Sequence, residues 1–181
     1  ANLPMEPIIG MKDPFHYRNK AQFPVGRNRD GKIVTGFYAG RTHSIIENRD
    51  CVLGVPQNRE ILDRVIDYME TYDISPYDEV TGKGLIRHIF TRYGYHTGEI
   101  MVCIVANGSR LPHQQELVKA LREIPGMTSI TLNINKNRNN VILGEKIQVL
   151  WGQEYITDKI GDISYQISPL SFYQVNPQQT R

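Results

Sequence analysis

The sequence predicts an α+β fold with a largely antiparallel β-sheet and two main helices. Strand-like runs recur along most of the 181 residues, and only two segments show helical periodicity. No strand is followed by a glycine turn of the G-x-G-x-x-G kind and a helix. Because a Rossmann domain holds its ligand with that turn and the helix N-terminus, the chain is not expected to be one.

The N-terminal third predicts a strand meander followed by a helix. Residues 18–27 and 32–39 are rich in β-formers and are separated by an Asp-Gly pair, which is a strong hairpin signal, and residues 43–47 can add a third strand. From Asn58, the expected N-cap, the period becomes helical. The acidic face of this helix is interpreted as facing solvent. Its apolar stripe consists of Ile61, Leu62, Val65, Ile66, Met69 and Tyr72.

The remainder of the chain predicts more strands and one further helix. The helix has Pro112 near its first turn and ends at Pro125-Gly126. Two strand-strand-helix blocks, 20–73 and 85–124, leave open an arrangement as two small lobes. The apolar stripe of the second helix is Leu117, Val118, Leu121 and Ile124, and the strands are expected at 85–93, 100–106, 129–135, 141–143, 147–150 and 163–167.

The composition is that of a folded chain with a core, with 40% hydrophobic and 22% charged residues. No run of about eighteen apolar residues and no signal peptide is present, so a cytoplasmic protein without membrane contact is expected. Cys51 and Cys103 are too few for a disulfide framework, and Cys103, inside an apolar run, is expected to be a small buried hydrophobe. The five histidines lack metal-ligand spacing and are expected to be surface or strand residues.

The charge is unevenly distributed along the chain. The net charge is +2, but residues 51–80 carry seven acidic and two basic side chains, so the rest of the chain carries +7. Such a surface suits a polyanion, since Lys and Arg near phosphates release counterions; a merely solvated face is the equal alternative. Arg18, Lys20 and Arg27, which lie beside aromatic or amide residues at the hairpin ends, are candidate RNA contacts.

The C-terminal stretch SFYQVNPQQTR is dense in aromatic and amide side chains. Phe172 offers a face for stacking, and Gln174 offers both a donor and an acceptor, which suits the edge of a uracil-like base. The alternative is a β-turn with one aromatic side chain packed into the core.

Four segments, 11–25, 36–54, 133–152 and 167–180, resemble the RNA uracil-5 methyltransferase family, the TrmA/RumA-like enzymes acting on ribosomal or transfer RNA. The most specific stretch is SFYQVN, and the sequence as a whole is most similar to the ribosomal RNA members of Gram-positive bacteria. The resemblance implies that residues 1–168 are the family's central α+β domain. It implies that 169–181 form a linker or loop entering a catalytic domain that binds S-adenosyl-L-methionine and lies downstream.

The resemblance also implies residue roles. Gln174 matches the family glutamine at the mouth of the active site, near cofactor and target base, and Phe172 matches its aromatic neighbour. The catalytic cysteine and base are expected downstream, so this chain should contain no catalytic residue and should be inactive alone. Cys51 matches the fourth ligand of a 4Fe-4S cluster found in many members. Because such a cluster needs four ligands, Cys51 is expected to be a free thiol here, and a metal ligand only if the full-length protein holds the cluster.

The sequence therefore predicts the central, RNA-positioning portion of a methyltransferase that uses S-adenosyl-L-methionine and acts on 23S ribosomal RNA, with transfer RNA as the alternative substrate. The rival hypothesis is a free-standing, non-enzymatic α+β module that binds RNA or a protein partner. Neither the modified uridine nor the oligomeric state follows from the sequence.

Overall fold

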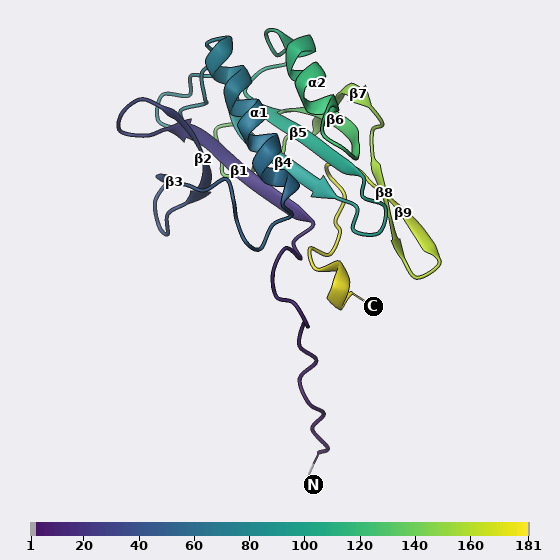
Figure 1. The fold of residues 1–181 in the computed structure, drawn as a ribbon. Coiled ribbons are helices and arrows are strands. Elements are labelled where there is room, and N and C mark those ends of the chain that lie inside the picture. Colours follow the sequence, from purple (N-terminus) through teal and green to yellow (C-terminus); the bar gives the residue numbers. More distant parts are fainter. Residues whose placement is uncertain (1–2, 181) are drawn as a thin grey trace.

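The computed structural model describes residues 3–180. Seven strands form one sheet in the order β3-β2-β1-β4-β5-β6-β7, while β8 and β9 form a separate hairpin. Helices α1 (Gln57–Thr71) and α2 (Gln114–Arg122) cover one face of the sheet (Figure 1). The strands are β1 Lys20–Arg27, β2 Ile33–Tyr38, β3 Ile45–Glu47, β4 Ile86–Tyr93, β5 Ile100–Ala106, β6 Met127–Ile134, β7 Lys146–Gly152, β8 Ile156–Ile160 and β9 Ile163–Ile167. The predicted α+β class is confirmed.

The pairing of the strands joins the two strand-strand-helix blocks into one sheet. β1 pairs antiparallel with β4, with Lys20 opposite Arg92, so the blocks do not form the two lobes that the sequence left open. Every other pair in the sheet is antiparallel except β5 with β6. These two strands are parallel because α2 lies between them in the chain and carries it back across the sheet.

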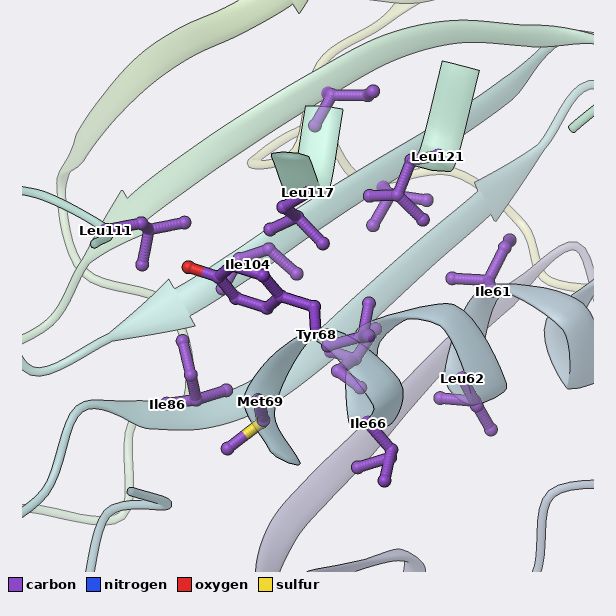
Figure 2. Close-up of a cluster of buried hydrophobic side chains, with 14 of the residues drawn as sticks. Ile61, Leu62, Ile66, Tyr68, Met69, Ile86, Ile104, Leu111, Leu117 and Leu121 are labelled. Atoms are coloured by element: carbon purple, nitrogen blue, oxygen red, sulfur yellow. The ribbon is translucent and has the colours of Figure 1, made fainter. Parts of the chain in front are cut away.

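The main core lies between the helices and the sheet. Leu62 and Met69 of α1 and Leu117 of α2 are fully buried, and Figure 2 shows them in the same cluster of buried side chains as Ile104 of β5. Burying one such side chain contributes roughly 1.5–3 kcal/mol. The Tyr68 hydroxyl also donates to the carbonyl of Pro112, which ties α1 to the segment before α2. Packing of apolar stripes, as the helical periodicity indicated, therefore holds both helices on the sheet.

Successive residues of β5 alternate between the two faces, so the sheet has a second apolar layer opposite the helices. There, Cys103 and Val105 pack with Phe90 of β4, as expected for a buried Cys103. Beside them Met101 packs against the β8–β9 hairpin and Tyr173. The C-terminal segment, yellow in Figure 1, runs along this side of the sheet.

Two sequence predictions about individual elements are wrong, and one element was missed. Asn58 is not the N-cap, since α1 begins at Gln57; instead the Asn58 side chain is buried and accepts a hydrogen bond from Thr91 Oγ1 at 2.8 Å. Residues 141–143 form a loop, in which Ile142 and Leu143 pack on the second apolar layer. Strand β8 was not predicted.

Candidate functional site

Residues 168–180, called the tail from here on, are attached to the sheet by Arg92. This residue lies on β4 and is only 4% exposed. Its Nη2 donates to the carbonyl of Ser171 and, at 3.4 Å, to that of Pro169. Burial lowers the pKa of Arg92 to about 10, so the guanidinium stays charged near neutral pH. A buried cation therefore sits beneath the backbone of the tail.

Asn19 provides a second attachment, immediately before β1. Its side chain is buried, and Nδ2 donates to the carbonyl of Gln174 at 2.9 Å. Its backbone N–H donates to the carbonyl of Val175 at 3.1 Å. The main chain that follows the Gln174 side chain is thus fixed by two hydrogen bonds to one residue.

Asp158 of β8 provides the third attachment. It is fully buried, and its carboxylate accepts hydrogen bonds from the backbone N–H groups of Tyr95 at 2.9 Å and His96 at 2.8 Å. The Tyr173 hydroxyl donates to the same carboxylate at 3.1 Å. Burial, together with the Asp158 charge, raises the pKa of Tyr173 to about 12. Asp158 therefore joins three segments that are distant in sequence.

These attachments decide which tail side chains are available to a ligand. Tyr173 packs inward against the hairpin, whereas Phe172 before it is 86% exposed and Gln174 after it is also exposed. The sequence left open whether one aromatic side chain of this segment packs into the core. The structure shows that Tyr173 packs inward. Phe172 and Gln174 project outward from a fixed main chain, as a base-contacting pair would need to.

A cluster of cations lies beside the tail. Lys20 is the cross-strand partner of Arg92. The pKa of Lys20 is lowered by its partial burial, by Arg92 and by Arg18, which places both arginines within electrostatic reach of Lys20. None of the ion pairs found among residues 3–180 includes any of the three. A bound anion would relieve this repulsion, so the cluster favours a phosphate group.

Arg18 and Lys20 also line a cavity of about 460 Å³ that contains Cys51. Cys51 is a half-buried free thiol, and Phe37 and Leu53 supply apolar wall. Among residues 3–180, no group of three or more His, Cys, Asp or Glu side chains is placed to hold a metal ion. The described residues therefore do not fit a 4Fe-4S cluster, which needs four ligands.

Arg27 is not part of this cluster. It is exposed at the far end of β1, where its Nη1 donates to the carbonyl of Gly31 at 2.6 Å. At about 3.3 Å per residue, the seven steps along β1 put it roughly 23 Å from Lys20. The structure thus brings together Arg18, Lys20, Phe172 and Gln174 through Arg92 and Asn19, and it separates Arg27 from them.

Sequence reasoning missed the residues that hold the tail: Asn19, Arg92, Asp158 and Tyr173. One signal was present in the sequence. Arg92 follows Ile89-Phe90-Thr91 in a strand whose side chains are nearly all buried, and a charged residue in such a strand needs a buried partner. Nothing local, however, identifies the tail carbonyls, about eighty residues downstream, as that partner.

Comparison with known proteins indicates what kind of chain carries this site. The chain is 46% identical over 178 residues to an uncharacterised RNA methyltransferase of Halalkalibacterium halodurans, covering 98% of this chain and 39% of that protein. It is 45% identical to one of Oceanobacillus iheyensis, covering 99% and 39%. The chain thus matches one segment of these RNA methyltransferases. The chain spans 39% of the length of these curated relatives, and no family model matches it.

A solved structure of an RNA methyltransferase has a similar fold. The crystal structure of the Pyrococcus abyssi tRNA (uracil-54, C5)-methyltransferase with S-adenosyl-L-homocysteine aligns with a TM-score of 0.77 at 26% identity, over 93% of this chain and 39% of that one. The curated relatives are thus RNA methyltransferases, and the solved structure that shares this fold is a uracil-5 enzyme, in agreement with the resemblance in the sequence. In the part of the chain that the structure describes, no helix is long and apolar enough to cross a membrane.

Proposed function

We propose that this chain is the RNA-positioning portion of an RNA (uracil-5-)-methyltransferase that uses S-adenosyl-L-methionine. The observation that carries the proposal is the tail. Asn19 and Arg92 bind its main chain and Asp158 binds the Tyr173 hydroxyl, while Phe172 and Gln174 stay exposed beside uncompensated cations. The names of the relatives support RNA as substrate, and the methyl donor is supported by the S-adenosyl-L-homocysteine in the archaeal structure.

The residues of this chain would act by binding and orienting. A uridine must leave the base stack before its C5 can react, and the exposed base then needs stacking and hydrogen-bonding partners. Phe172 can stack on the base face, and the Gln174 amide can both donate to and accept from its edge. Arg18 and Lys20 would bind flanking phosphates. The donor supplies the methyl group, and the exposed Gln174 is the residue of this chain that would contact it.

Of the two RNA substrates, we propose 23S ribosomal RNA, on the likeness of SFYQVN and the flanking segments to the ribosomal enzymes. The archaeal relative acts on a tRNA uracil, so tRNA is the comparison substrate. Methylation assays of the full-length protein on both RNAs, with mapping of the methylated base, decide between them. Methylation only of tRNA would contradict the ribosomal assignment, and methylation of neither would contradict the enzyme proposal in favour of a non-enzymatic module.

The cation cluster has its own test. Each phosphate contact contributes about 0.7 to the slope of log affinity for single-stranded RNA against log salt. We therefore expect the double substitution Arg18→Gln and Lys20→Gln, which removes two such contacts, to reduce the magnitude of this slope by about 1.4. Lys119 and Arg110 are exposed and distant from the tail, so the double substitution Lys119→Gln and Arg110→Gln is the matched control. An equal loss in both double variants would show that Arg18 and Lys20 contribute only net charge.

A further inference from the structure

A second recessed surface lies at the other end of the sheet from the tail. Two adjoining cavities, of about 630 and 160 Å³, share His43, Tyr77 and Glu79 in their walls. We call them together the arginine groove, because Arg27 and Arg29 line the larger cavity and Arg87 and Arg138 line the smaller. The function proposed above uses none of these residues.

The carboxylates of the arginine groove are engaged by donors of this chain. Asp78 Oδ1 accepts from the backbone N–H groups of Val80 at 2.8 Å and Thr81 at 3.0 Å. Glu79 pairs with His43 at 2.6 Å and accepts from the Tyr38 hydroxyl at 3.5 Å. The four arginines, by contrast, take part in none of the ion pairs found among residues 3–180. The groove therefore keeps excess positive charge that no carboxylate of the described residues pairs with.

Aromatic rings lie among these cations. Tyr38 is 39% exposed and meets the His43 ring edge-on, with 5.4 Å between the ring centroids. The guanidinium of Arg87 lies 4.4 Å from the centroid of the Tyr77 ring. Tyr77 is itself buried, so the exposed rings are those of Tyr38 and His43, and exposed rings beside arginines are the combination on which splayed bases stack. An acidic peptide would be bound by the cations alone, without the rings.

The loop that carries Arg138 is held in place by buried groups. Asn135 Nδ2 donates to the carbonyls of Val141 at 2.7 Å and Ile142 at 3.0 Å. Arg87, only 4% exposed, donates from Nη1 to the carbonyls of Asn135 at 3.0 Å and Asn137 at 2.7 Å. The Arg138 guanidinium lies against Gly82, where a Cβ atom would collide with it. Arg138 is thus already placed at the groove before any ligand arrives.

We propose that the arginine groove binds an unpaired segment of the substrate RNA, with phosphates at Arg29 and Arg138 and a base against Tyr38 and His43. This inference rests on the proposed function and deepens it, because it gives the RNA a second contact at the far end of β1, roughly 23 Å along the strand from Lys20. An unpaired segment is required, since the bases of a duplex are stacked and cannot reach recessed rings.

The test measures binding of a short uridine-rich single-stranded RNA to this chain as a function of salt. The groove variant is the double substitution Arg29→Gln and Arg138→Gln, and the control is again Lys119→Gln with Arg110→Gln; all four residues are exposed. We expect the groove variant to bind more weakly, with a salt slope lower by about 1.4, and the control to keep the slope of the unsubstituted chain. Cross-linking of thiouridine-substituted RNA, mapped by mass spectrometry, should identify Tyr38 or His43 without any substitution.

Each contrary outcome has a distinct meaning. If the unsubstituted chain binds RNA and the groove variant keeps its slope, the groove inference is wrong while the proposed function stands. If the unsubstituted chain does not bind RNA, both are wrong. If polyglutamate displaces the RNA from the groove as efficiently as unlabelled RNA does, the groove is a site for acidic protein, and the inference is overturned.

Discussion

Substituting Arg92 by methionine should release the part of the tail nearest to it. Methionine preserves most of the side-chain length and its apolar packing, but it removes the donors to the carbonyls of Ser171 and Pro169. Net hydrogen bonds from charged groups contribute roughly 1.5–3 kcal/mol each. Since the contact to Pro169 is long, at 3.4 Å, the two together should stabilise the attached state by about 2–3 kcal/mol.

Amide hydrogen exchange measures this attachment directly, because it reports local opening. The backbone N–H groups of Ser168 and Ser171 are both hydrogen-bonded within the turn that Arg92 holds. A loss of about 2–3 kcal/mol corresponds to exchange roughly 30- to 150-fold faster at these amides. Amides of β5, in the centre of the sheet, should change far less.

The control is Arg122→Met, which removes a guanidinium that lies 4.9 Å from the Trp151 ring centroid and contacts no tail residue. It should leave exchange at Ser168 and Ser171 unchanged. If Arg92→Met folds, as judged by slow exchange in β5, and these two amides still exchange at the unsubstituted rate, then Arg92 does not hold the tail. The explanation given for the exposure of Phe172 would then be wrong.

Three further predictions concern buried titratable groups. Burial, with Arg87 nearby, lowers the pKa of His88 to about 4. The stability that is present above about pH 6.5 should therefore be lost as the pH falls towards 4, by up to about 3 kcal/mol. Urea unfolding at several pH values should show this loss in the unsubstituted chain and not in His88→Leu. Because the pKa of Tyr173 is raised, its stabilising effect should be present below about pH 10 and should be lost between about pH 10 and 12. Over that range the unsubstituted chain should lose more stability than Tyr173→Phe. Equal losses would show that Tyr173 is not buried against Asp158. Burial raises the pKa of Cys103 to about 12, so a thiol reagent should modify Cys51 alone in the folded chain and both cysteines after unfolding; rapid modification of Cys103 in the folded chain would contradict its burial.

Local patterns predicted the fold well where burial is uniform. Strand 100–106 is a continuous apolar run that is buried on both faces, and the predicted bounds agree with those of β5. Strand β8 was missed because Thr157, Asp158 and Lys159 resemble a polar turn, although Asp158 is fully buried. The loop at 141–143 looked like a strand because its apolar side chains do pack on the sheet, without strand pairing.

The candidate site was predictable only in its exposed part. Phe172 and Gln174 stand out by residue type within the resemblance, and Arg18 and Lys20 stand out by charge. The contacts that organise them join residues far apart in the chain, such as Asn19 with Gln174 and Arg92 with Ser171. A sequence pattern reports periodicity over neighbouring positions, so it cannot show which carbonyl a buried side chain will meet.

The central claim is that the fixed tail presents Gln174 to the target uracil. The most direct measurement is single-turnover methylation of RNA by the full-length protein, comparing Gln174→Ala with Gln166→Ala, an exposed glutamine of β9. Because the bound uracil would lose a hydrogen-bond partner, Gln174→Ala should lower methylation by an amount equivalent to about 1–3 kcal/mol, whereas Gln166→Ala should leave methylation unaffected. Equal rates in the two variants, with methylation at uracil C5 intact, would contradict the claim.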